Sequence, residues 1–254
     1  MTRLSPPSLY RCPACARYFT RSVLTSLHFY EDVLIWSDGK NEQWWAGIGG
    51  PAGRCPSCRT VVWVDSNTAL VRDHWAPPPV GIWSRLWHML TWDRSGRLRE
   101  EREWASLPRE KREAERLDSL STVQDYVDAL AQIVPLLPDR EEYLRRKLWW
   151  ASNDHLRRES GGPALEADAA RANMQRLLDL LPSTAGILER VELCRQLGRF
   201  QEALDLIPLA PPDQQGKARL QQQWAEAGDS TMRVIPPQPA APFRTPRREM
   251  STGS

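Results

Sequence analysis

Residues 9–19, LYRCPACARYF, contain two cysteines that enclose a proline and an alanine, and residues 54–63, RCPSCRTVVW, repeat the arrangement. In a C-x-x-C turn both sulfur atoms can face one ion, and two such turns provide the four thiolates of a tetrahedral Zn²⁺ site. The proline fixes φ in each turn and so limits the entropy lost when the turn becomes ordered. The spacing predicts a single zinc site with the ligands Cys12, Cys15, Cys55 and Cys58.

Disulfide bonds and a redox pair are the alternative interpretations of these cysteines. Disulfides are rare in a reducing cytosol, and a thioredoxin-like site has one C-x-x-C motif beside a βαβ unit rather than two matched motifs. A catalytic zinc keeps an open position for water, whereas four cysteines close the coordination shell. We therefore expect a structural zinc, with its charge offset by backbone amides and by Arg11, Arg54 and Arg59.

The head of the chain, over about residues 8–66, resembles the zinc-ribbon family, a small antiparallel β module held by two such turns. Ribbons often have glycine after the second cysteine of each turn, but Ala16 and Arg59 stand there in this sequence. The 39 residues between the two motifs also exceed the typical spacing of about 15–20. Strands are expected at residues 23–30, 33–38 and 60–64, which are rich in β-branched and aromatic residues.

The head is assigned to residues 1–79, and residues 80–120 are expected to form an amphipathic and charged helical connector. Within the connector, residues 82–90 place apolar side chains on one helical face. Residues 97–118 are dense in mixed charge, which suits a solvated helix or helix pair that is broken or restarted at Pro108.

Residues 121–232 have apolar residues at helical spacing, in short segments joined by turns that contain proline or glycine. Ser121 and Gln124 are predicted to form a capping box at the start of the first helix. The segment CRQLG, 194–198, returns as WAEAG, 224–228, and glycine after the last helical residue is the usual left-handed stop. The pattern predicts an all-α stack of antiparallel helix pairs.

Two further resemblances concern the helical part and the layout. Residues 196–204, QLGRFQEAL, resemble the turn between the two helices of a tetratricopeptide repeat (TPR), which implies a TPR-like stack. The layout resembles a set of bacterial proteins with a CPxC–WSDG–CPxC head and a WWxxND box, here Trp36–Gly39 and Trp149–Asp154. The predicted fold class is therefore α+β, a zinc ribbon followed by a TPR-like domain, with a disordered Pro-rich basic tail at residues 233–254.

Catalysis is not expected from this sequence. The four histidines have no metal spacing, Cys194 is a lone thiol on a predicted apolar helix face, and no phosphate-loop, nucleophile-elbow or dinucleotide motif occurs. No signal-peptide pattern or membrane span is recognised, which favours a cytoplasmic protein.

Protein binding is the function that the sequence favours, as a cytosolic adaptor, chaperone or cognate inhibitor. Twelve tryptophans are many for 254 residues, and Trp and Arg dominate interface hot spots. In the alternative interpretation the tryptophans pack in the helical bundle and Asp154 pairs with Arg157 or Arg158. The predicted contact set is Trp149, Trp150, Asn153 and Asp154.

Nucleic-acid binding or regulation through the zinc ribbon is the alternative function. Arginines in the head lie beside Tyr18 and Phe19, which are expected to be exposed and able to stack on bases. The net charge of +2, with no strongly basic segment, argues against this alternative.

Overall fold

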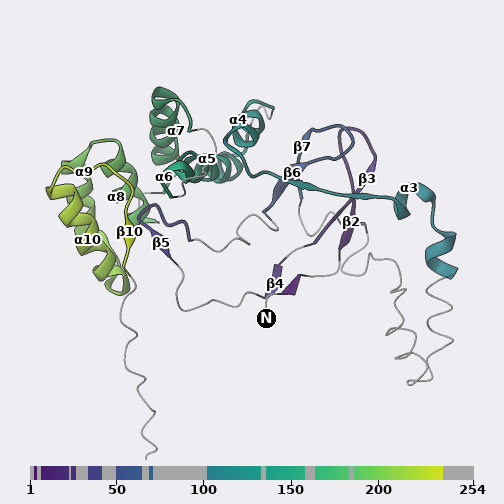
Figure 1. Ribbon diagram of the computed structural model, residues 1–254, viewed down its shortest axis with the longest axis horizontal. Helices are drawn as coiled ribbons and strands as arrows, with labels where there is room; N and C mark the ends of the chain where they lie inside the picture. The colour runs from purple at the N-terminus through teal and green to yellow at the C-terminus, as the bar shows by residue number, and fades with distance from the viewer. Residues whose placement is uncertain are drawn as a thin grey trace, which may run out of the picture.

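The computed structural model describes residues 3–4, 7–22, 24–26, 34–41, 50–64, 69–70, 102–132, 136–157, 164–182 and 186–236 (Figure 1). The predicted helix at 82–90, most of the predicted strand at 23–30 and the tail beyond residue 236 lie outside these ranges. Small sheets form the head and helices form the C-terminal part, so the α+β class is confirmed. Within the described ranges, no helix combines the length and the apolar character that crossing a membrane requires.

Two antiparallel hairpins make up the head, and each carries one C-P-x-C turn at its tip. In the first hairpin, β2 (Ser8–Arg11) pairs with β3 (Tyr18–Arg21). In the second, β6 (Ala52–Arg54) pairs with β7 (Val61–Trp63). A further short antiparallel pair flanks the first hairpin in the sequence: β1 (Arg3–Leu4) precedes it and β4 (Leu24–Ser26) follows it. The predicted strand at 60–64 is thus confirmed.

Residues 115–119, which we call the strap, add a strand to each hairpin. Its first part, β8 (Glu115–Arg116), runs parallel to β3, and its second part, β9 (Asp118–Ser119), runs antiparallel to β6. Helix α3 (Arg109–Arg112) begins after Pro108 as expected, but the helix predicted up to residue 118 is wrong for the strap. The open edges of two hairpins provide hydrogen-bond partners that outweigh the helical charge pattern.

Leu117, at the centre of the strap, is buried in the core of the head. Its N–H donates to the carbonyl oxygen of Thr20 at 2.8 Å. Its side chain packs with residues of both hairpins, two of which are predicted metal ligands. The members of this core are Tyr10, Cys12, Phe19, Cys55, Val62, Val64 and Leu117. The strap therefore joins the two hairpins through backbone pairing and through apolar burial.

The helical part begins where the strap ends, and consecutive helices contact one another along the chain. The elements are α4 (Val123–Gln132), α5 (Pro138–Ser152), α6 (Asp154–Arg157), α7 (Ala167–Leu180), α8 (Ile187–Gln196), α9 (Phe200–Leu206), the 3₁₀ turns η3 (Ile207–Leu209) and η4 (Pro212–Gln214), and α10 (Gln215–Glu226). A core around Trp149, Leu177 and Val191 joins α5, α7, α8 and the helices that follow, while the second hairpin packs against α4 and α5.

The helix ends test the local predictions. A capping box exists at α4, but it is formed by Thr122 and Asp125, one residue later than predicted: the Asp125 N–H donates to Thr122 Oγ1 at 3.1 Å, and the Thr122 N–H donates to Asp125 Oδ2 at 3.0 Å. Both predicted glycine stops are confirmed, since Gly198 and Gly228 have φ of 75° and 64°. At each of them a 6→1 backbone bond closes the helix, as in a Schellman motif.

Strand β5 (Ile35–Trp36) leaves the head and pairs with β10 (Val234–Ile235), near the other end of the chain. Figure 1 shows this ribbon beside the C-terminal helices. The prediction of a tail that is disordered from residue 233 is therefore wrong for its first residues. The Ser37 N–H donates to the Arg233 carbonyl at 2.7 Å, the Arg233 N–H donates to Ser37 Oγ at 3.0 Å, and β10 completes a sheet. A strand lies within the predicted range 33–38, but it pairs with β10 and not with a strand of the head.

Candidate metal centre and its surroundings

The sulfur atoms of the four predicted ligands meet at the tips of the two hairpins. All four lie within 4.8 Å of one another, and the pairs Cys12–Cys58 and Cys15–Cys55 are each 3.8 Å apart. A regular tetrahedron with Zn–S bonds of about 2.3 Å has edges of about 3.8 Å. A disulfide requires about 2.05 Å, and the cysteines are free. The structure therefore confirms a four-sulfur group that can bind a metal ion.

The two C-P-x-C turns have the same backbone. In the first, the Cys12 N–H donates to the Arg17 carbonyl at 2.8 Å and the Ala16 N–H to the Cys12 carbonyl at 2.9 Å. The second repeats both bonds at 2.9 Å, from Cys55 and Arg59. Ala16 and Arg59 have φ of 61° and 62°, in the left-handed region that favours glycine. The two turns thus have the same geometry although Ala16 and Arg59 stand at positions that favour glycine.

Hydrogen bonding at the sulfurs differs between the ligands. Burial raises the pKa of the Cys12 thiol, and it raises the pKa of Cys55 to about 12. Hydrogen bonds from the hydroxyl and N–H of Thr60 lower the pKa of Cys58 to about 6. Backbone N–H groups within each turn also donate to Cys12 and Cys55, so the expectation that amides point at the sulfurs is confirmed there.

The three arginines predicted to offset the thiolate charge have other partners. Arg54 donates to two carboxylates on α4, at 3.0 Å to Asp125 and 2.8 Å to Asp128. Arg59 pairs with Asp118 of the strap. Arg11 donates from Nε to the carbonyl of Ala16 at 3.1 Å. The arginines therefore fasten the turns to α4, to the strap and to their own backbone.

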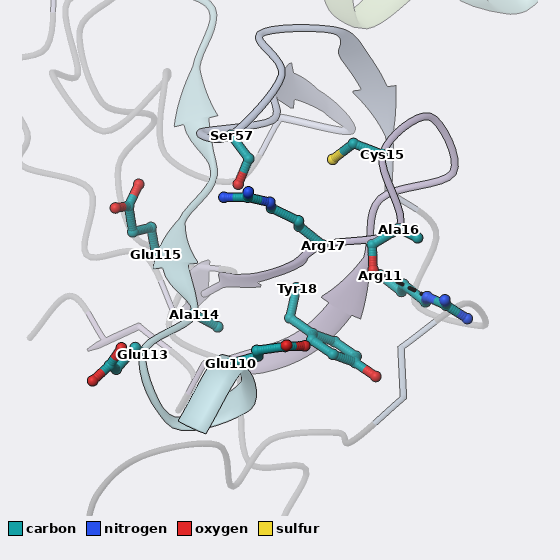
Figure 2. A pocket seen from close by; sticks show the side chains of 10 residues that line it. All are labelled: Arg11, Cys15, Ala16, Arg17, Tyr18, Ser57, Glu110, Glu113, Ala114 and Glu115. Atoms are coloured by element: carbon teal, nitrogen blue, oxygen red, sulfur yellow. Dashed lines mark hydrogen bonds between the residues drawn. The ribbon is translucent and has the colours of Figure 1, made fainter. Parts of the chain in front are cut away.

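A pocket of about 580 Å³ lies beside the metal centre, between the first turn, Ser57 and helix α3 (Figure 2). The Cys15 side chain reaches its wall, and Arg17 extends across it toward Ser57. Three glutamates from α3 and the strap line the other side: Glu110, Glu113 and Glu115. Cys15 and Cys58 are half-buried, whereas Cys12 and Cys55 are each 1% exposed. A pocket thus adjoins one side of the four-sulfur group, a feature that the sequence did not reveal because the strap is a tertiary contact.

The four residues of the predicted contact set have their partners within the chain. Trp149 is 1% exposed and donates from Nε1 to Gln196 at 2.9 Å. Trp150 donates from Nε1 to the carbonyl of Asp38 at 2.9 Å, and Asn153 donates from Nδ2 to the Asp38 carboxylate at 3.1 Å. The packing interpretation, including a pair between Asp154 and Arg157, therefore describes these contacts.

The WSDG turn, residues 36–39, is thus held by the WWxxND box. Asp38 also accepts from Arg157, and the side chains of both residues are at most 2% exposed. Lys40, just after the turn, donates to Asp154 at 2.5 Å. The two motifs were singled out separately in the sequence, and the structure brings them together across more than a hundred residues. No sequence signal predicted that contact.

Of the other candidates, Cys194 lies in the core of the helical part, and His28, His74 and His88 lie outside the described residues. Cys194 is fully buried, and burial raises the pKa of its thiol to about 11, as expected for a core residue. Over the ranges that the structure describes, the four cysteines are the one group of three or more side chains able to hold a metal.

The comparisons with known proteins give no further guidance: no protein-family model, no curated protein and no solved structure matches the chain.

Proposed function

We propose that the chain is a non-enzymatic protein-binding adaptor, chaperone or cognate inhibitor, whose head is held by one structural Zn²⁺. The supporting observation is the four-sulfur group, because its shell leaves no position for a substrate or water. Four thiolates in tetrahedral array suit Zn²⁺ or iron, and zinc brings no redox chemistry. The metal fixes the tips of the hairpins, and the second hairpin in turn packs on α4 and α5.

An open cleft of about 610 Å³ is the proposed docking place for the partner. Its walls include Trp150 of α5, Leu188 of α8 and the isoleucines of the β5–β10 ribbon. Charged side chains complete the lining, among them Arg146, Glu189 and Lys217. An apolar floor with an aromatic residue and a polar rim is the usual anatomy of a protein interface.

The TPR-like arrangement is part of this proposal. Helices α8, α9 and α10 contact one another in sequence, and both α8 and α10 end in a Schellman motif. Stacked helix pairs of this kind present a groove to a partner segment. Of the predicted contact set, Trp150 alone lines the cleft, and so it is the member that we propose to contact a partner.

Nucleic-acid binding has less support. Phe19, expected to be exposed, is 2% exposed and stacks on Tyr10 with ring centroids 5.6 Å apart. The ammonium group of Lys111 lies over Tyr18, 5.4 Å from its ring centroid. Both aromatic side chains are therefore engaged within the protein. Retention of the protein on a nucleic-acid column in dilute salt, lost as salt rises, would favour this alternative.

Site-specific photo-crosslinking tests the docking place. A photoreactive amino acid replaces Lys217, which lines the cleft, and in a matched variant it replaces Arg219, which is exposed on the same helix but does not line the cleft. In extracts of the native host we expect one protein to be crosslinked from position 217 and not from position 219. Crosslinking that is equal at both positions, or absent from both, would contradict the proposal.

A further inference from the structure

The WSDG turn is recognised by polar side chains that come from distant parts of the sequence. Ser37 and Asp38 are buried although they form a turn, and their partners lie on α5, α6, α8 and α10. We call these partners the socket: Trp150, Asn153, Arg157, Glu192, Arg195 and Gln221.

The side chains and the carbonyl groups of Ser37 and Asp38 meet complementary groups. The Asp38 carboxylate accepts from Asn153 and Arg157, and its carbonyl accepts from the indole of Trp150. The Ser37 hydroxyl donates to Glu192 Oε1 at 2.7 Å, and the Ser37 carbonyl faces the Gln221 amide at 3.4 Å. The contacts thus distinguish an aspartate from an asparagine and a serine from an alanine.

The socket is organised without the turn. Glu192 and Arg195, both fully buried, bind each other through two bonds of 2.7 and 3.0 Å. The Gln196 amide donates to Glu192, and the Trp149 indole donates to Gln196. Arg157 is held at the carbonyl of Trp150 and at Asp154. These bonds lie within the helical part, so the helices present a formed polar site.

Packing one segment onto another through buried polar and charged groups costs desolvation free energy that apolar packing does not. Buried charges rarely stabilise more than apolar residues of the same volume, but they are selective for the group that they hold. An apolar turn would have served if attachment alone were required. Hydrogen bonds to a carboxylate, a hydroxyl and two carbonyls are typical of a specific binding site.

We propose that this socket is a recognition site for a tight turn of Ser-Asp-Gly type, which the chain's own WSDG turn occupies and which a partner protein takes over by presenting such a turn. The inference rests on the proposed protein-binding function and names the chemistry of the partner. Ser37, Asp38, Gly39 and Gln221 also line the cleft, so a segment lying in the cleft reaches the turn. The partner's additional cleft contacts offset the advantage of the tethered turn, whose effective concentration is of order millimolar.

Peptide binding to the full chain tests the inference. The probe is a fluorescein-labelled peptide of residues 34–41, LIWSDGKN, followed by fluorescence anisotropy. The Asp38→Ala chain, whose own turn is weakened, is expected to bind the peptide at least about tenfold more tightly than the wild type. A peptide with Asp38→Asn is expected to bind the Asp38→Ala chain at least about tenfold more weakly than the unchanged peptide. Adding Arg157→Ala to the Asp38→Ala chain is expected to abolish binding of the unchanged peptide.

The outcomes separate the two proposals. A folded Asp38→Ala chain that does not bind the peptide, or that binds the Asp and Asn peptides equally, overturns the inference. A partner that is still crosslinked from position 217 in that case leaves the proposed function standing. Association between Asp38→Ala and Arg157→Ala chains, measured by sedimentation of the mixture, would identify the partner as a second copy and support the inference.

If the Asp38→Ala chain does not fold, the inference is tested by peptide crosslinking to the wild-type chain. The same peptide then carries a photoreactive leucine at position 34 and is used at about millimolar concentration, where it competes with the tethered turn. Mapping of the crosslinks to α5 and α6, reduced by an excess of unlabelled peptide but not of the Asp38→Asn peptide, supports the inference. Crosslinks that are absent, or equal with both competitors, overturn it.

Discussion

Leu117 of the strap lies directly over Gly53 of the second hairpin, so that a Cβ atom on Gly53 would be 2.6 Å from the Leu117 Cδ2 atom and 2.7 Å from the carbonyl oxygen of Asp118. The strap approaches β6 this closely because residue 53 has no side chain. The contact leaves no room for a side chain at residue 53 unless the strap shifts.

Substitution at Gly53 tests this contact. Gly53→Ala is expected to lower the free energy of unfolding by about 1–3 kcal/mol, as overpacking of a dense core does. Urea denaturation measures the change. In a Leu117→Ala background the same substitution should cost less, since the leucine side chain no longer occupies the space. Equal stability of Gly53→Ala and wild type would show that the strap does not lie where the structure places it.

In the C-P-x-C turns a substitution to glycine is expected to stabilise the protein, because Ala16 and Arg59 have left-handed backbone conformations. Ala16→Gly is expected to raise the free energy of unfolding by about 0.5–1 kcal/mol, because glycine adopts this φ without the steric cost that alanine has, although it loses more entropy on folding. Ala14→Gly, in the same turn but at a residue without positive φ, is the control and should destabilise. Thermal unfolding of the zinc-loaded chain measures both; an Ala16→Gly protein that melts lower than the wild type would contradict the argument.

Removal of the metal is expected to unfold the head. The purified chain should contain one zinc per molecule by elemental analysis, and a strong chelator should lower its melting temperature markedly, since structural zinc contributes about 10–16 kcal/mol of apparent folding free energy in small modules. Cys12→Ser should lose the metal, whereas Cys194→Ala, at a buried cysteine outside the group, should retain it. Bound iron, or metal content unaffected by Cys12→Ser, would be inconsistent with the proposed centre.

Glu141 gives the stability a defined pH dependence. Hydrogen bonds from Arg176, and next from Arg145, hold the pKa of Glu141 at about 2, against 4.5 for an ordinary glutamate. Because the folded pKa is the lower one, the stabilisation is complete above about pH 4.5 and is lost as pH falls toward about 2. Glu141→Gln should therefore reduce the acid dependence of chemical denaturation in that window. Glu166→Gln, at an exposed glutamate, should leave it unchanged; equal slopes for wild type and Glu141→Gln would disprove the assignment.

The features that the sequence predicted correctly are local ones. The cysteine spacing places four sulfurs because each turn positions two of them by itself, and Gly198 and Gly228 end helices through bonds within six residues. The one-residue error at the capping box has a similar origin. Ser121 and Thr122 are each followed three residues later by a side chain with an acceptor oxygen, and the Asp125 carboxylate bonds the backbone N–H of Thr122.

The features that the sequence did not predict depend on distant partners. The strap carries a helical charge pattern, yet it pairs with β3, 96 residues earlier, and with β6, 64–66 residues earlier, because their edges are open and Leu117 can be buried. Residues 33–38 were assigned to the predicted zinc-ribbon module by their composition, but β5 within them pairs with β10. The WSDG turn and the WWxxND box were both visible as motifs, and only the folded chain shows that one binds the other.

The pairing of β5 with β10 has a consequence for the order of events during protein synthesis. Domains generally begin to fold while the chain is still being made. Both C-P-x-C turns are complete once residue 58 has been added, but the strand beside the WSDG turn has no partner until residues 234–235 have been added. The nascent protein therefore carries β5 without its partner while about 200 further residues are added.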